Sequence, residues 1–133
     1  MTEELRILVV DDEPDTLGLI ELTLHTAGYQ VQLASNGQEG LQMARSNTFD
    51  LILLDVMMPD VSGFDVLREL KKDSTPLPPV IILTAKNQPE DREIGLSLGA
   101  TSFLGKPITR GKLLDSIQQA LGEETFTDAS GQL

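Results

Sequence analysis

The sequence contains no cysteine among its 133 residues. Without thiols, neither a disulfide framework nor a thiolate metal site can form, and a reducing compartment is the natural location for such a chain. A domain of about this length buries roughly 68–70% of the surface that its unfolded chain exposes. We therefore expect one domain that is stabilised by its hydrophobic core alone.

Long apolar runs and an excess of basic residues are also absent. No run approaches the roughly 20 residues that span a bilayer, and no charged leader precedes a hydrophobic stretch, so we expect a cytoplasmic protein without a membrane partner. Ten Lys and Arg against twenty-one Asp and Glu give a net charge of −11. This balance argues against direct nucleic-acid binding, which depends on neutralising phosphates with basic side chains.

Five short apolar runs are present, and we expect them to be strands at residues 6–10, 31–34, 51–54, 80–83 and 102–104. Each run is read as continuously hydrophobic, which is typical of a parallel sheet that is buried on both faces. The segments between the runs have the apolar spacing of helices. The alternation of strand and helix predicts a doubly wound α/β fold.

Five helices are expected between and after these strands. Pro14 begins the first, which continues to residue 26; Asn36 and Gly37 begin the second; and the third covers 63–72. In the third helix we expect Phe64, Leu67 and Leu70 to face inward. Pro89 begins the fourth, which Gly99 ends, and Thr109 caps the last, which continues to about residue 121.

Polar residues follow four of the expected strands. In doubly wound folds ligands bind at the carboxyl ends of the strands, so side chains in these positions should gather at one edge of the sheet. The residues concerned are Asp11 and Asp12 after the first strand, Asp55 after the third, Thr84 after the fourth and Lys106 after the fifth.

The three carboxylates would repel one another if this edge brings them together. At separations of ~4 Å each pair costs about 4 kcal/mol at an effective dielectric constant near 20. Oxygen ligands without His or Cys suit a hard divalent cation such as Mg²⁺. Lys106 and the Thr84 hydroxyl could bind phosphoryl oxygens, and Asp55, alone at its strand end, is the best candidate nucleophile for phosphoryl transfer.

Four short motifs carry a family resemblance: VVDDEP at 9–14, LLDVMMPD at 53–60, LTA at 83–85 and KP at 106–107. In order and spacing they resemble the motifs of response-regulator receiver domains of two-component signal transduction. The resemblance covers about residues 5–121 and leaves 122–133 as a flexible tail or the start of a linker. It implies a flavodoxin-like sheet with strand order 2-1-3-4-5.

The resemblance also implies a role for each site residue. Asp55 would accept a phosphoryl group from the phosphohistidine of a histidine kinase or phosphotransfer protein, as a phosphoprotein of a phosphorelay rather than as an enzyme with external substrates. Asp11, Asp12, Asp55 and the backbone carbonyl of Met57 would hold Mg²⁺, with Mn²⁺ as an alternative. Thr84 would bind the phosphoryl group.

At the fifth strand the resemblance implies that Lys106 pairs with the phosphoryl group and that the Lys106–Pro107 peptide bond is cis, since only bonds to proline take this form at modest energy. Phe103 stands where many members have Tyr or His as a rotamer switch, and it could swing without hydrogen bonding. Met57 and Lys86 lie at positions where members vary in dephosphorylation rate. The surface over residues 85–121 would then switch to bind a partner or a second copy.

Each site residue also has an ordinary structural explanation. Taken singly, Asp11 or Asp12 could cap the first helix, Thr84 could cap a turn, and Lys106 could be a solvated lysine. Because all of them follow strands whose ends converge, we favour the joint functional interpretation.

Three other functions remain open on the sequence alone. A Mg²⁺-dependent phosphohydrolase also uses an aspartate nucleophile at a strand end, but that class usually has a second aspartate two residues later, where this chain has Met57. A flavin-binding module shares the fold, yet the loop after the first strand is acidic here. A receiver that serves only as a scaffold is the third, and the complete set of site residues argues against it.

Overall fold

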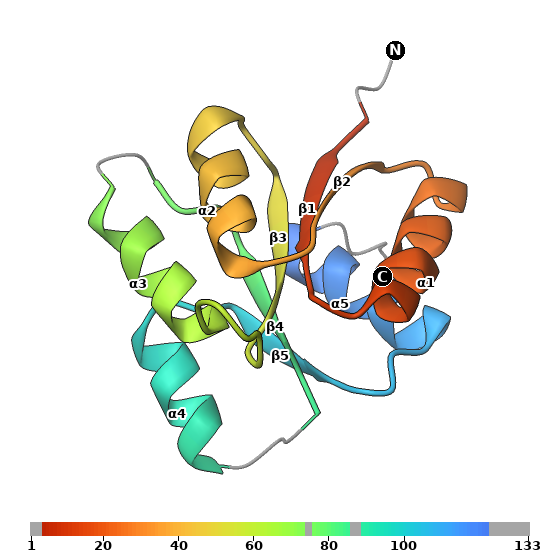
Figure 1. Ribbon diagram of the computed structural model, residues 1–133. Helices are drawn as coiled ribbons and strands as arrows, with labels where there is room; N and C mark the ends of the chain where they lie inside the picture. The colour runs from red at the N-terminus through yellow and green to blue at the C-terminus, as the bar shows by residue number, and fades with distance from the viewer. Residues whose placement is uncertain (1–3, 74–75, 86–88, 123–133) are drawn as a thin grey trace.

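A five-stranded parallel sheet forms the centre of the protein, which the computed structural model describes for residues 4–73, 76–85 and 89–122. The strand order is β2-β1-β3-β4-β5, as predicted (Figure 1). The strands are β1 (Arg6–Val10), β2 (Gln30–Ala34), β3 (Leu51–Asp55), β4 (Val80–Thr84) and β5 (Ser102–Gly105).

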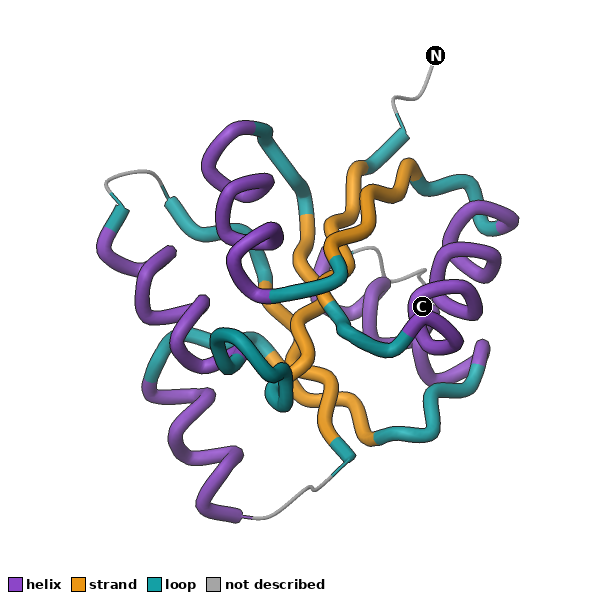
Figure 2. The backbone as a smooth tube through the Cα atoms, in the orientation of Figure 1, coloured by secondary structure: helices purple, strands orange, loops and turns teal. Residues whose placement is uncertain are grey.

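Helices cover both faces of this sheet (Figure 2). On one face lie α1 (Pro14–Thr26) and α5 (Arg110–Leu121). On the other lie α2 (Gly37–Ser46), α3 (Gly63–Lys72) and α4 (Pro89–Ser97). None of the helices that the structure describes has the length and apolar composition needed to cross a bilayer.

The core has two halves because successive strand residues point to opposite faces. In β1, Ile7 and Val9 pack toward α1 and α5, whereas Leu8 and Val10 pack toward α2 and α3. Every residue of β3 and β4 is buried. The continuous hydrophobic runs predicted from the sequence are therefore confirmed for the central strands.

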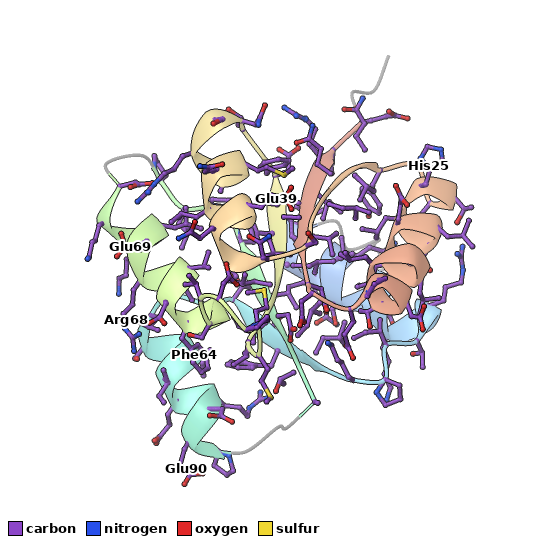
Figure 3. All side chains as sticks on the ribbon, viewed as in Figure 1. His25, Glu39, Phe64, Arg68, Glu69 and Glu90 are labelled. Atoms are coloured by element: carbon purple, nitrogen blue, oxygen red, sulfur yellow. The ribbon has the colours of Figure 1, made fainter. Side chains whose placement is uncertain are left out.

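Two expectations about burial were wrong. The edge strand β2 alternates between exposed and covered positions, because Val31 and Leu33 pack against the core on the α1 and α5 face, whereas Gln30 and Gln32 point to the other face and are exposed. In α3, Phe64 is only half-buried (Figure 3), and Val66 is buried instead. The buried stripe of this helix contains Val66, Leu67 and Leu70. Phe64 lies in the first turn of the helix, at the margin of this stripe.

Side-chain caps fix where three helices begin. The Asn36 side chain accepts a hydrogen bond from the Glu39 N–H at the start of α2, Ser62 accepts one from the Asp65 N–H at α3, and Thr109 accepts one from the Lys112 N–H at α5. Such caps satisfy N–H groups that have no partner within the helix.

Replacement by alanine should change the free energy of unfolding in opposite directions at two helical glycines. A Cβ at Gly40 of α2 would lie 2.7 Å from Cγ2 of Val10, whereas one at Gly18 of α1 would meet nothing within 4 Å. Replacing glycine by alanine favours an exposed helix by about 0.5–1 kcal/mol, and overpacking a core costs about 1–3 kcal/mol. We therefore expect Gly18→Ala to raise the free energy of unfolding and Gly40→Ala to lower it, measured by urea denaturation. A gain in both variants would show that α2 does not lie tightly on β1.

Candidate functional site

Three carboxylates meet at the carboxyl ends of β1 and β3. The register pairs Val10 with Leu54, so the residues that follow them, Asp11 and Asp55, come side by side. One carboxylate oxygen from each of Asp11, Asp12 and Asp55 lies within 4.8 Å of the others. Asp11 is 0% and Asp55 3% exposed, whereas Asp12 is half-buried. The structure thus brings the three predicted acids together.

Asp55 lines an open cavity of about 660 Å³. Burial, and next the negative charge of Asp11, raise the pKa of Asp55 to about 6, against opposition from Lys106 and from the backbone N–H of Met57. This N–H is 3.4 Å from Asp55 Oδ1. Thr16, Leu19, Met57, Ala85 and Pro107 also line this cavity.

Lys106 supplies the positive charge of the site. Its Nζ lies 3.0 Å from Asp11 Oδ2 and 3.6 Å from Asp55 Oδ1. Burial alone would lower the pKa of Lys106, but the hydrogen bond to Glu13 and the ion pairs with Asp11 and Asp55 raise it overall. The ammonium group therefore stays charged throughout the neutral range.

Glu13 is the site residue that sequence reasoning missed. Its Oε1 accepts a hydrogen bond of 2.8 Å from Lys106 Nζ, which is shorter than the distance from Lys106 to Asp55. Thr16 Oγ1 donates to the same oxygen at 3.3 Å. The hydrogen bond and the charge of Lys106 lower the pKa of Glu13. The only sequence signal was its place directly after the acidic pair, because Lys106 is 93 residues away.

Asp11 has an oxygen that suits a cation. Its Oδ1 accepts a hydrogen bond of 2.9 Å from the Glu13 N–H, but its buried Oδ2 has no hydrogen bond of good geometry and has only the ion-pair distance to Lys106. This oxygen is ion-paired to Lys106 but accepts no hydrogen bond, so it has lone-pair capacity left for a cation. The oxygen-only donor set fits a hard divalent ion.

The remaining predicted residues lie around this centre. Thr84 ends β4 and is buried, and its carbonyl accepts a hydrogen bond of 2.8 Å from the Lys106 N–H. The Lys106–Pro107 peptide bond is cis. The Met57 side chain is 59% exposed beside the acids.

Phe103 lies apart from the acids and does not line the cavity around Asp55. Its half-buried ring fills the space that Gly95 of α4 leaves, since a Cβ there would overlap the ring. The guanidinium carbon of Arg92 lies 5.0 Å from the ring centroid. The Phe103 side chain therefore links β5 to α4.

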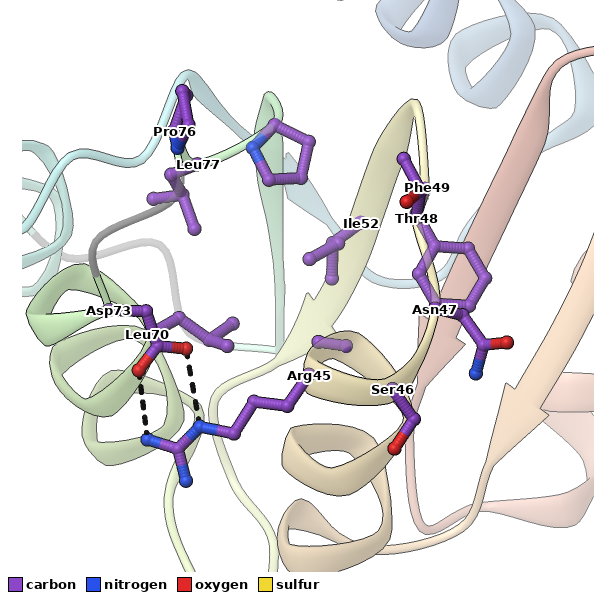
Figure 4. Close-up of a pocket in the computed structure, with 12 residues that line it drawn as sticks. Arg45, Ser46, Asn47, Thr48, Phe49, Ile52, Leu70, Asp73, Pro76 and Leu77 are labelled. Carbon is purple, nitrogen blue, oxygen red and sulfur yellow. Dashed lines mark hydrogen bonds and ion pairs between the residues drawn. The ribbon is translucent and has the colours of Figure 1, made fainter.

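A second cavity, of about 710 Å³, lies at the opposite edge of the sheet (Figure 4). Phe49, Ile52, Leu70 and Leu77 form its apolar wall, and Arg45 pairs with Asp73 through two contacts of 3.2 Å at its margin. It contains none of the predicted site residues. The charged side chains that line it, Arg45 and Asp73, are paired with each other.

The raised pKa of Asp55 predicts a pH-dependent effect of Asp55→Asn without divalent cations. Ionised Asp55 destabilises the fold because its pKa rises from 3.8 to about 6 on folding. This penalty is smallest near pH 4 and complete above pH 6, where removing it should raise the free energy of unfolding by about 1–3 kcal/mol. Urea denaturation in a chelating buffer at pH 4.5 and 8 measures the difference.

Asp115→Asn, on the exposed side of α5, is the matched control and should change stability by less than about 0.5 kcal/mol at both pH values. An equal gain from Asp55→Asn at both pH values would contradict the assignment of the penalty.

Comparison with known proteins agrees with this geometry. The family model of the response regulator receiver domain matches residues 7–118. The response regulator ArlR of Staphylococcus saprophyticus is 40% identical over 116 residues, which cover 87% of this chain and 52% of ArlR. Protein PilH of Pseudomonas aeruginosa is 40% identical over 117 residues, which cover 87% of this chain and 97% of PilH. The chain thus spans about half of ArlR and nearly all of PilH.

Solved structures give the same result for the fold. The chemotaxis protein CheY4 of Vibrio cholerae has a TM-score of 0.86 at 34% identity, with 90% of this chain and 100% of CheY4 covered. The receiver domain of the sensor histidine kinase PA1611 of Pseudomonas aeruginosa, solved with a magnesium ion coordinated in its active-site cleft, has a TM-score of 0.83 at 32% identity, with 90% and 99% covered. The chain therefore belongs to the response regulator receiver domain family of two-component signalling.

Proposed function

We propose that Asp55 accepts a phosphoryl group from the phosphohistidine of a histidine kinase or phosphotransfer protein, in a reaction that requires a divalent cation. One observation carries this proposal: Asp11, Asp12 and Asp55 converge beside an open cavity that Asp12 and Asp55 line, with Lys106 against Asp11 and Asp55. A fold needs no such cluster for stability, because like charges at this distance destabilise it.

The residues fit Mg²⁺, with Mn²⁺ as the alternative. Asp11, Asp12, Asp55 and the backbone carbonyl of Met57 would hold the ion, which typically takes one or two carboxylates together with waters and phosphate oxygens. When bound, it supplies charge neutralisation for the acids and for the phosphoryl oxygens. The buried Oδ2 of Asp11, which is ion-paired to Lys106 but accepts no hydrogen bond, and the all-carboxylate cluster found among the described residues support this choice.

In the proposed step, one bond forms and one bond breaks. A carboxylate oxygen of Asp55 attacks phosphorus, the bond from phosphorus to the imidazole nitrogen breaks, and the imidazole leaves with that electron pair, so an acyl phosphate forms. With a pKa of about 6, most of Asp55 is ionised at neutral pH and can act as the nucleophile. Lys106 then leaves Glu13 for a phosphoryl oxygen, and the Thr84 hydroxyl donates a hydrogen bond to another.

The same residues disfavour the alternative functions. The phosphohydrolase type needs an acid and base two residues after the nucleophile, and the thioether of Met57 cannot serve as either. A flavin phosphate would meet the negative edge formed by Asp11 and Asp12. The chain therefore acts in this proposal as a phosphoacceptor signalling domain and not as an enzyme with external substrates.

The output of the domain is proposed to be the surface of α4, β5 and α5. Phosphorylation would draw Thr84 toward the phosphoryl group and shift Phe103, and a coupling of typically 1–3 kcal/mol would suffice to change partner binding or dimerisation. We place this domain at residues 5–121, in the cytoplasm, and without contacts to nucleic acid. Lys86 and most of the predicted tail, 123–133, lie outside the described residues.

Phosphorylation can be measured directly by intact mass. Incubation with acetyl phosphate and Mg²⁺ should add about 80 Da, one phosphoryl group, to the wild type and to Asp115→Asn. Asp55→Asn should gain nothing, and neither should the wild type in excess chelator. An adduct of equal yield on Asp55→Asn would refute Asp55 as the acceptor. Steady release of phosphate from small phosphoesters, at many turnovers per molecule, would instead favour the phosphohydrolase.

A further inference from the structure

In the loop between β3 and α3, residues 56–62, the side chain of Asp60 accepts hydrogen bonds from the first turn of α2. The Gly37 N–H donates to Asp60 Oδ1 at 3.1 Å, and the Gln38 N–H donates to Asp60 Oδ2 at 3.0 Å. Desolvation by the neighbouring backbone acts to raise the pKa of Asp60, but these N–H groups hold it below its ordinary value. A carboxylate from a distant segment thus caps a helix that already has its own local cap in Asn36.

The backbones of these two segments also touch. A Cβ at Gly37 would lie 2.7 Å from the carbonyl oxygen of Val61, so only glycine lets the loop approach this closely. The loop is therefore held against α2 by two independent features, the Asp60 carboxylate and the contact between Gly37 and Val61.

Helix α2 is fixed in turn to the strand that carries the acidic pair. Gly40 lies against Val10, and Val10 directly precedes Asp11 and Asp12. The first turns of α2 thus connect two parts of the candidate cation site: the strand end that holds the acids and the loop that holds Met57.

We propose that Asp60 is a positioning residue that sets, through α2, where the Met57 carbonyl lies relative to Asp11 and Asp12. The inference rests on the proposed function, in which that carbonyl is a cation ligand. Loss of Asp60 would leave α2 with its local cap but would leave the loop held to α2 only by the contact between Gly37 and Val61, so that it could shift relative to the acids. Asp60 is exposed, so its replacement creates no cavity.

The test compares two caps of the same helix. Asp60→Ala should weaken Mg²⁺ binding, measured by isothermal titration calorimetry, about tenfold, the low end of the effect of losing an outer-shell support. Asn36→Ala removes the local cap, the 2.8 Å hydrogen bond from the Glu39 N–H, and should stay within about twofold of the wild type. Asp60→Asn, which keeps one acceptor oxygen, should fall between. The Mg²⁺-induced shift of the Met57 amide resonance should shrink in Asp60→Ala and persist in Asn36→Ala.

Two results would overturn this inference while leaving the proposed function intact. One is wild-type affinity in Asp60→Ala; the other is an equal loss in Asp60→Ala and Asn36→Ala, which would mean that only the stability of α2 matters. A wild-type chain that binds no Mg²⁺ would overturn the proposed function, and this inference with it.

Discussion

The mutual repulsion of Asp11, Asp12 and Asp55 is the constraint on which the site depends. Two charges 4.8 Å apart repel by roughly 3–4 kcal/mol at an effective dielectric constant of 20, and a whole domain is stable by only about 5–15 kcal/mol. Among the described residues, the ammonium group of Lys106 opposes this repulsion, and it is shared with Glu13. The pKa of Asp55 stays raised despite Lys106, so the compensation is incomplete. A further cation would therefore reduce the repulsion that remains.

The fold holds these charges together through backbone packing. Adjacent parallel strands place Asp11 and Asp55 side by side, and the core on both faces fixes β1 and β3. Close approaches at glycine then fix the surrounding segments. A Cβ at Gly63 would overlap the carbonyl oxygen of Asp55, so α3 begins directly against the backbone of the proposed acceptor. A change in the conformation of Asp55 would therefore affect the position of α3 as well as that of Lys106.

Much of this arrangement is predictable from the sequence because it depends on local patterns and one topological rule. Apolar runs, caps and helix stops locate the elements, and the convergence of strand ends brings Asp11, Asp12, Asp55 and Lys106 to one edge. The contact of Glu13 with Lys106 and the bonds of Asp60 to α2 were not predicted, since they join distant segments through particular side-chain conformations. The exposure of β2 and the margin position of Phe64 were mispredicted because they depend on which neighbours cover each element.

The central claim is that the acidic edge needs a divalent cation to relieve its repulsion. Its most direct test is the titration of the Asp55 carboxyl carbon by NMR with and without saturating Mg²⁺. The account predicts a midpoint near pH 6 without the ion, since burial and the charge of Asp11 raise the pKa of Asp55, and a midpoint at least one pH unit lower with the ion bound. A midpoint that Mg²⁺ leaves unchanged would contradict it.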